Sequence, residues 1–196
     1  TFDPTVLPRW SLVTPAYNEA QNLPLLYAQL VQVLDPSENN WEWIIIDDHS
    51  ADDTFQVAAR VAEQDPRVRA IRLARNVGSS AAVLCGLESC IGRCAVQMPS
   101  DLQYSPDVIH QLLNEWEQGA QVVWAVRTRR EGDNVSAKGF SRFYYFLMRR
   151  IVGIKEMPMT GADVFLIDRT VIAALSRFRE RNASLLTLIG WMGFRQ

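Results

Sequence analysis

Several signatures of common protein classes are missing from this sequence. No stretch reaches the ~18 consecutive apolar residues that a membrane-spanning helix needs. The formal net charge is −2, so there is no excess of basic residues for a nucleic-acid-binding surface. The cysteines Cys85, Cys90 and Cys94 and the histidines His49 and His110 lack the spacing of a zinc site. We therefore expect reduced, buried thiols, a cytosolic setting and no nucleic-acid partner.

Three familiar catalytic motifs are also absent. No Gly-x-Gly-x-x-Gly follows the first predicted strand, which argues against a dinucleotide site of the Rossmann type. There is no P-loop, and no Ser/His/Asp arrangement accompanied by a nucleophile elbow. With these motifs excluded, the remaining candidates for a functional site are the acidic side chains in the loops.

Short apolar segments alternate with amphipathic ones along most of the chain. The segments predicted as strands are 10–14, 43–46, 68–73, 94–98, 122–126 and 164–167. The segments predicted as helices are 23–34, 50–63, 79–90, 105–118, 140–152, 169–178 and 185–192. This alternation predicts an α/β fold with a doubly wound, mostly parallel sheet and helices on both faces.

Charged side chains follow the predicted strands at the points where the strands end. The loops are 15–19, 47–50, 75–78 and 99–103, and they carry Glu19, Asp47, Asp48, Arg75 and Asp101. Ligands bind at the carboxyl ends of parallel strands, which meet at one edge of a sheet. A carboxylate there can hold a divalent cation, and the cation can hold a diphosphate. The pattern predicts a metal-compatible pocket for a nucleoside diphosphate.

Four segments in these loops resemble the blocks of the family 2 glycosyltransferases, which have the GT-A fold. They are Pro15-Ala16-Tyr17-Asn18-Glu19, Asp47-Asp48-His49-Ser50-Ala51-Asp52-Asp53-Thr54, Arg75-Asn76-Val77-Gly78 and Ser100-Asp101-Leu102-Gln103. Within that family the chain is most similar to the polyprenyl-phosphate (dolichyl-phosphate type) sugar transferases, over about residues 10–196. Each segment alone is a weak signal, whereas four in the same order are a specific one.

By this resemblance, the first two loops would bind the nucleoside of a nucleoside diphosphate sugar. Pro15, Tyr17 and Glu19 would line the pocket for the base and the ribose. Asp48 would hydrogen-bond the base or the ribose, with Asp47 beside it. We expect UDP rather than GDP as the nucleotide of the donor.

The next two loops would bind the diphosphate. Arg75 would approach the phosphates, and Asp101 would hold the Mg²⁺ or Mn²⁺ that bridges them. The metal and Arg75 would stabilise the leaving diphosphate during an in-line displacement that inverts the anomeric carbon. The further nucleotide-binding positions implied by the resemblance are Asn76, Gly78, Ser100 and Gln103.

The acceptor side is implied by later positions. Asp163 matches an acidic position near the reacting sugar and would act with Asp101 in catalysis, as a base or as an acid that orients the acceptor. Arg127, Arg129 and Arg130 would form a lid or a clamp for the acceptor phosphate. A polyprenyl phosphate is already anionic and needs no strong base, whereas a sugar hydroxyl must lose its proton to a carboxylate.

We expect one domain with two halves. Residues 1–126 would bind the nucleotide sugar, and residues 127–196, with a C-terminal helical segment, would form the acceptor side. The resemblance implies that the natural chain continues beyond residue 196 into membrane helices. It places the protein at the cytoplasmic face of a membrane, in the synthesis of cell-envelope glycans.

Three positions depart from the family pattern and keep alternatives open. Pro99 stands where the usual Asp-x-Asp has its first acid, His49 replaces a Gly, and Leu186-Thr187 replace an Arg-Gly pair. The first departure favours a metal-weak or inactive nucleotide-sugar-binding domain. The last favours a transferase that acts on a sugar hydroxyl. A nucleotidyltransferase would instead carry a Gly-rich loop with Arg and Lys after the first strand.

Overall fold

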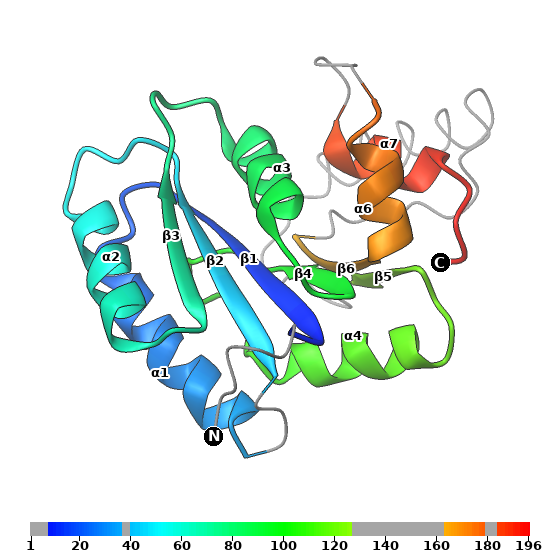
Figure 1. Ribbon diagram of the computed structural model, residues 1–196, viewed down its shortest axis with the longest axis horizontal. Helices are drawn as coiled ribbons and strands as arrows, with labels where there is room; N and C mark the ends of the chain where they lie inside the picture. The colour runs from blue at the N-terminus through cyan, green and yellow to red at the C-terminus, as the bar shows by residue number, and fades with distance from the viewer. Residues whose placement is uncertain (1–7, 37–39, 127–162, 179–183) are drawn as a thin grey trace, which may run out of the picture.

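The computed structural model describes residues 8–36, 40–126, 163–178 and 184–196, which form one six-stranded sheet with helices packed on it (Figure 1). The strands are β1 (Trp10–Ala16), β2 (Trp41–Asp47), β3 (Val68–Arg72), β4 (Cys94–Gln97), β5 (Val122–Ala125) and β6 (Val164–Asp168). The helices are α1 (Asn22–Leu34), α2 (Thr54–Gln64), α3 (Ser79–Ser89), α4 (Val108–Glu117), α6 (Arg169–Leu175) and α7 (Leu185–Trp191). The predicted helix at 140–152 lies outside the described residues.

The strand order is β3-β2-β1-β4-β6-β5, and β1 to β4 all run parallel. Strand β6 runs antiparallel to both of its neighbours, β4 and β5. Its first residues pair with the end of β4, because Phe165 lies opposite Gln97. The start of β6 therefore reaches the same edge of the sheet as the ends of β1 to β4, and Asp163, just before β6, lies at that edge.

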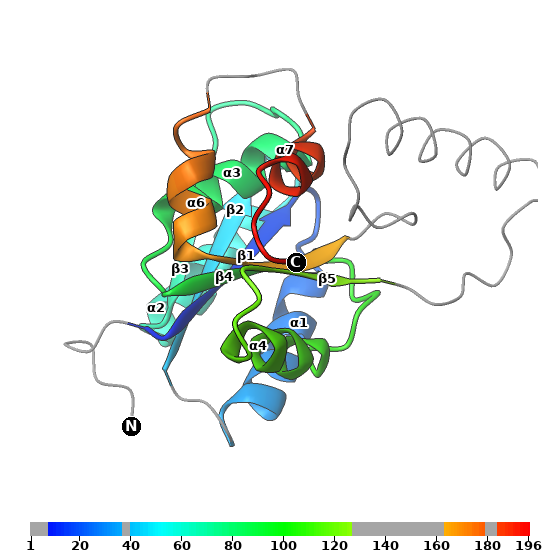
Figure 2. The same ribbon diagram turned by 90° about the vertical axis from the view of Figure 1, so that its right-hand side faces the viewer.

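Two hydrophobic layers cover the sheet, one on each face. On β2, Trp41, Trp43 and Ile45 pack with α1, α2 and α4, whereas Ile44 and Ile46 pack with α3, α6 and α7. Figure 2 shows α1 and α4 on one side of the sheet and α3, α6 and α7 on the other. All seven residues of β2 are buried, as expected for a central parallel strand. The predicted doubly wound α/β sheet is confirmed.

Buried polar groups connect the amino ends of the strands. Glu42 is 5% exposed, and its Oε1 accepts hydrogen bonds from Ser11 Oγ and from Ile91 N, both at 2.6 Å. Its Oε2 accepts a hydrogen bond from Arg69 Nη2 at 2.9 Å. One acid thus joins β1, β2, β3 and the segment that enters β4.

Most element boundaries fall within a few residues of the prediction, and β1 is the informative exception. The sequence predicted that Pro15 ends the strand at Thr14, but β1 continues to Ala16. Residue 15 directs its backbone toward β4, which has already ended at Gln97, and the Pro15 carbonyl accepts from Ser100 Oγ at 3.2 Å. The missing N–H of proline therefore removes no hydrogen bond from the sheet.

Three helices are clearly shorter than predicted. Helix α2 begins at Thr54 rather than at residue 50, because Thr54 N donates to Asp52 Oδ1 at 3.0 Å in a turn before the helix. Helix α4 begins at Val108 rather than at Pro106, because Val108 N donates to Ser105 O across a tight turn. Helix α6 ends at Leu175, before the predicted Phe178.

Among the described residues, no helix is long and apolar enough to cross a bilayer. The two predicted halves share the sheet, since β6 pairs with β4 and β5. Their division of labour stays a prediction.

Candidate functional site

Unusual backbone geometry gathers in the loops that follow β1 to β4. In the described part of the chain, only Asn18, His49 and Leu102 have a positive φ without being glycine, with values of 56°, 60° and 60°. They lie after β1, β2 and β4, and Gly78, with φ of 89°, lies after β3. The left-handed region costs a non-glycine residue about 1–2 kcal/mol. Such strain tends to cluster at functional sites, where the surroundings hold it in place.

The loops after β1 and β2 hold each other through short polar side chains. Asn18 N donates to Ser50 Oγ at 2.9 Å, and Glu19 N donates to Thr54 Oγ1 at 2.7 Å. In return, Ala51 N donates to Asn18 Oδ1 at 2.9 Å. These bonds hold Asn18 in its left-handed conformation. The two loops that are predicted to bind the nucleoside therefore form one unit.

The predicted nucleoside-binding residues of the first loop differ in exposure. Tyr17 is 48% exposed at the edge of the sheet. The carboxylate of Glu19 accepts from Asn22 Nδ2 at 2.6 Å, and the backbone carbonyl of Glu19 accepts the first helical bonds of α1. The side chain of Tyr17 is thus available to a ligand, while Glu19 is partly engaged at the start of the helix.

Asp47 is built into the loop after β2. Its side chain is fully buried, and Oδ1 accepts from Ser50 N at 3.0 Å. Oδ2 lies 3.3 Å from Arg72 Nε but accepts no hydrogen bond from the described residues, so the ion pair alone compensates its charge. Arg72 also donates to Ser50 O at 3.1 Å and lies over the ring of Phe55. Asp47 and Arg72 together fix the path of this loop.

Asp48 reaches in another direction, toward the loop after β3. It is 3% exposed, and its two oxygens accept hydrogen bonds from Val77 N and Gly78 N, each at 2.8 Å. The neighbouring His49 Nδ1 donates to Leu73 O at 3.1 Å, which assigns the proton to that ring nitrogen. The loop after β2 thus holds the segment 73–78 at two points.

Between these two points lie Arg75 and Asn76, and both are exposed. Gly78 is the N-cap residue of α3, and its carbonyl accepts from Ala81 N and Ala82 N. Its positive φ suits glycine, which has no Cβ to clash in this conformation. The predicted phosphate-binding loop therefore presents its polar side chains to solvent from a firmly held base.

The loop after β4 carries the predicted metal ligand. Ser100 is buried and donates to Pro15 O, while Asp101 is half-buried and its Oδ1 accepts from Gln103 N at 3.2 Å. No group of three His, Cys, Asp or Glu residues suited to a metal exists within the described residues. Asp101 therefore offers one carboxylate. This fits only a cation that takes its other oxygens from substrate phosphates and water, as Mg²⁺ commonly does.

Asp163 meets the loop after β4 through a tyrosine. Tyr104 Oη donates to Asp163 Oδ2 at 3.2 Å, although Asp163 is 59 residues later in the chain. The antiparallel course of β6 makes this contact possible. The sequence analysis did not single out Tyr104, because neither spacing nor composition reveals which way β6 runs.

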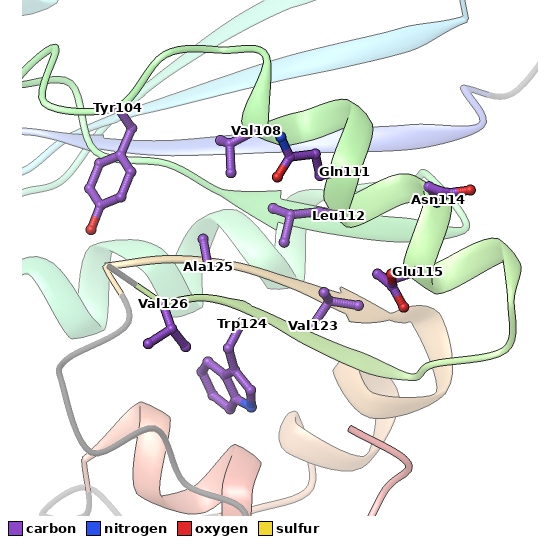
Figure 3. Close-up of a pocket in the computed structure, with 10 residues that line it drawn as sticks. All are labelled: Tyr104, Val108, Gln111, Leu112, Asn114, Glu115, Val123, Trp124, Ala125 and Val126. Carbon is purple, nitrogen blue, oxygen red and sulfur yellow. The ribbon is translucent and has the colours of Figure 1, made fainter. Parts of the chain in front are cut away.

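Tyr104 also lines a cavity of about 710 Å³ between α4 and the edge strand β5 (Figure 3). The other lining residues are Val108, Gln111, Leu112, Asn114, Glu115, Val123, Trp124, Ala125 and Val126. The cavity is separate from the loops after β1, β2 and β3, so it is not the predicted nucleoside pocket. It borders the position of Asp163, because Ala125 pairs with Val164 across β5 and β6. All of its lining residues belong to the half predicted to bind the nucleotide sugar, but the cavity lies beside Asp163, which was predicted for the acceptor side.

The structure thus brings most of the predicted site residues to one edge of the sheet. Arg127, Arg129 and Arg130 lie outside the described residues. The polar groups that hold the loops were largely missed, although Ser50 and Thr54 stood within a segment that the sequence analysis had singled out. Their short hydroxyl side chains in a loop after a strand were the available signal, but their partners are brought close only by the fold.

The fold has close counterparts among solved structures. A mannosyltransferase of Pyrobaculum calidifontis in complex with GDP-Man and Mn²⁺ superposes with a TM-score of 0.64 at 22% identity, covering 98% of this chain and 55% of that one. A glucosyl-3-phosphoglycerate synthase of Mycobacterium tuberculosis, with Mn²⁺, UDP-glucose and phosphoglyceric acid, gives 0.63 at 18% identity, covering 84% of this chain and 58% of that one. These likenesses show that the chain has the GT-A fold.

The model of glycosyl transferase family 2 matches residues 11–175, and the chain belongs to that family. The uncharacterized glycosyltransferase YkcC of Bacillus subtilis is 32% identical over 188 residues, which cover 96% of this chain and 58% of the relative. The undecaprenyl-phosphate 4-deoxy-4-formamido-L-arabinose transferase of Pseudomonas syringae is 33% identical over 173 residues, covering 88% and 51%. The bactoprenol glucosyl transferase of Shigella phage SfX is 29% identical over 183 residues, covering 93% and 60%.

The chain therefore spans between 51% and 60% of the length of these relatives. The resemblance to polyprenyl-phosphate sugar transferases is confirmed by the names of two of them. What those whole proteins act on remains, for this chain, a matter of proposal.

Proposed function

We propose that this chain transfers a sugar from a nucleoside diphosphate to a polyprenyl phosphate, with inversion at the anomeric carbon. One observation carries the proposal: the four family segments meet at a single sheet edge, in loops whose backbone strain is held by partly buried hydrogen bonds. Asp163 joins them from β6. A site built at such structural cost is expected to position a ligand.

The donor would lie across the loops after β1, β2 and β3. The exposed ring of Tyr17 can stack on a base, and Asp48 is placed between the nucleoside loops and the loop of Arg75. Arg75 can reach the diphosphate from its exposed position. We propose UDP as the nucleotide in preference to GDP, and competition between the two nucleotides for binding tests this choice.

Asp101 would hold Mg²⁺ or Mn²⁺ on the diphosphate, as one carboxylate among phosphate and water ligands. When bound, such a cation neutralises charge that develops on the leaving diphosphate. The hydrogen bond of Gln103 N to Asp101 Oδ1 fixes the side chain and leaves Oδ2 as the more accessible oxygen. Structural neighbours crystallised with Mn²⁺ support this part of the proposal.

The acceptor would approach from the side of Tyr104 and Asp163, where the cavity between α4 and β5 opens. The anionic oxygen of a lipid phosphate can attack without a general base, so Asp163 would orient the acceptor and the sugar. The arginines at 127, 129 and 130 would contribute positive charge to the acceptor phosphate. The relatives named for undecaprenyl phosphate and bactoprenol support this acceptor. A lipid acceptor would place the reaction at a membrane surface, and we propose the cytoplasmic face.

A second function is favoured by Pro99, which leaves Asp101 without the neighbouring acid of the usual motif. In that case the chain binds nucleotide sugars weakly through metal, or without it, and transfers nothing. A transfer to a sugar hydroxyl is the other alternative, with Asp163 taking the proton.

The deciding experiment is a transfer assay with radiolabelled UDP-sugars and GDP-sugars, undecaprenyl phosphate in detergent, and either Mn²⁺ or EDTA. We expect metal-dependent label in the lipid extract, with an inverted anomeric configuration by NMR. Nucleotide binding without any transfer supports the binding domain instead. Label that appears only in a soluble glycan supports the hydroxyl acceptor.

A further inference from the structure

The two hydrogen bonds of Asp48 stand out among the polar contacts of the site. Both carboxylate oxygens accept backbone N–H groups at 2.8 Å, from Val77 and Gly78, and the side chain is buried. Hydrogen bonds to a charged acceptor are roughly twice as strong as neutral ones. No cationic side chain among the described residues forms an ion pair with this carboxylate. The loop after β3 is therefore what satisfies Asp48, and Asp48 is what holds that loop.

The loop needs this partner because of where it leads. Gly78 precedes the first turn of α3, where backbone N–H groups have no partner inside the helix, and no side chain of the loop caps them. An anion is favoured at such a helix start by the dipole of the helix. Asp48 provides that anion from the loop after β2, and its bonds to Val77 N and Gly78 N fix the position at which α3 begins.

Arg75 and Asn76 lie just before the residues held in this way. On their other side, Leu73 is held by His49 through its carbonyl and by Asp47 O through its N–H, at 2.9 Å. Only residues 74–76 lie between the two anchored points. The position from which the Arg75 guanidinium extends is therefore fixed by the contacts of Leu73 on one side and by the hydrogen bonds to Asp48 on the other.

We propose that Asp48 is a positioning residue for the diphosphate. It places the loop that carries Arg75, so that binding of the nucleoside and binding of the phosphates both depend on Asp48. This inference rests on the proposed function, because it takes a nucleoside diphosphate as the ligand. Each oxygen of Asp48 keeps a second lone pair for the base or the ribose. One carboxylate then serves both halves of the nucleotide.

The test compares UMP with UDP, each titrated by calorimetry in Mg²⁺, for the wild type and four variants. The quantity of interest is the gain in affinity that the second phosphate gives. Arg75→Ala should lower this gain, by about tenfold for the loss of one charged hydrogen bond. Asp48→Asn keeps the size of the side chain but turns an N–H group toward the loop. It should weaken UMP binding and also lower the gain to the level of Arg75→Ala.

The double variant Asp48→Asn/Arg75→Ala should show no further loss of the gain, because both changes disable the same contact. If Asp48 serves the nucleoside alone, Asp48→Asn weakens UMP and UDP by the same factor, and the inference is wrong. Glu63→Gln removes one negative charge from an exposed position on α2 and should change neither affinity.

Hydrogen exchange of the protein without nucleotide gives an independent measurement. In Asp48→Asn, the amides of Val77 and Gly78 should exchange at least about tenfold faster, since each loses a hydrogen bond to a charged acceptor. The amides of Ile44 and Ile45 in β2 should keep their protection, which shows that the fold is intact. Unchanged exchange at Val77 and Gly78 would overturn the inference. If no nucleotide binds the wild type, the proposed function fails, while this measurement still decides whether Asp48 holds the loop.

Discussion

The two ends of the sheet treat their buried acids differently. At the amino end, Glu42 is paired with Arg69, and Asp65 is paired with Arg67 at 2.7 Å. At the carboxyl end, Asp48 is satisfied by backbone N–H groups and has no cationic partner among the described residues. A carboxylate neutralised by arginine has little to offer a ligand. One held by neutral N–H groups keeps its charge available.

This difference predicts that acids at the amino end of the sheet contribute to stability, whereas acids at the carboxyl end contribute to ligand binding or transfer. Removing an acid at the amino end should cost stability and leave ligand binding unchanged. Removing an acid at the carboxyl end should cost binding or transfer more than stability. Asp47 is the exception at the carboxyl end, because Arg72 pairs with it, and it should behave as a structural acid.

The largest effect on stability is expected at Glu42. Glu42→Ala leaves Ser11 Oγ and Ile91 N without their acceptor and removes the carboxylate that pairs with the partly exposed Arg69. Leaving buried hydrogen-bonding groups unsatisfied costs about 1–3 kcal/mol. Urea unfolding followed by circular dichroism measures the change. Glu42→Gln keeps an acceptor oxygen and should lose less. A loss below about 1 kcal/mol for Glu42→Ala would show that solvent replaces the network.

The largest effect on activity is expected at Asp101. Asp101→Asn removes the carboxylate that we propose holds the cation and should lower transfer by at least about a hundredfold. Its free energy of unfolding should stay close to that of the wild type, because Asp101 forms no ion pair with a described residue. The transfer assay with a titration of Mn²⁺ measures both rate and metal affinity. Full activity in Asp101→Asn would assign the metal, or the need for one, elsewhere.

Much of the fold could be predicted because the strands carry strong local signals. The apolar run Trp43–Ile46 indicates a strand buried on both faces, and the rule that parallel strands end at one edge then places four loops together. The helical spacing of apolar residues in 23–34 likewise predicts a helix packed on the sheet without knowledge of contacts. The position of Asp101 follows from these features alone.

Other features depend on contacts that sequence patterns do not encode. The direction of β6 depends on how the chain returns after residue 126, so the meeting of Tyr104 with Asp163 could not be foreseen. The acceptors of Val77 N and Gly78 N could not be foreseen either, because every residue except proline carries the same backbone donor. His49 shows the limit of propensity: its left-handed φ is disfavoured, but the hydrogen bond to Leu73 offsets part of the cost.

A smaller effect on stability is expected when the pH is lowered, through Asp65 at the amino end of the sheet. Burial alone would raise the pKa of Asp65, but hydrogen bonds from the side chain and backbone of Arg67 and from Tyr27 outweigh it and lower the pKa. A carboxyl whose pKa is lowered by folding stabilises the protein above its unfolded pKa, near 3.9, and this contribution is lost as the pH falls through the folded pKa. Stability should therefore decline below about pH 4.

Urea unfolding between pH 6 and pH 3 measures this decline. Asp65→Asn should be less stable than the wild type at neutral pH, and the difference should shrink as the pH falls below about 4. A difference that is the same at every pH would mean that the charge of Asp65 contributes nothing. Nucleotide affinity at neutral pH should be equal in the two proteins, as the contrast between the two ends requires.

The smallest effect is expected at Tyr104, whose hydrogen bond to Asp163 is exposed. Tyr104→Phe removes the hydroxyl and keeps the ring, and the loss of one hydrogen bond of about 1 kcal/mol corresponds to roughly a fivefold change. If Tyr104 positions Asp163 for the acceptor, the KM for the lipid phosphate should rise while the KM for the donor stays the same. Tyr104→Phe should not change the KM for the lipid phosphate any further when it is introduced into the Asp163→Asn variant. Equal increases in the KM for the donor and the KM for the lipid phosphate would mean that Tyr104 only supports the loop of Asp101. Tyr104 would then not belong to a separate set of acceptor-binding residues.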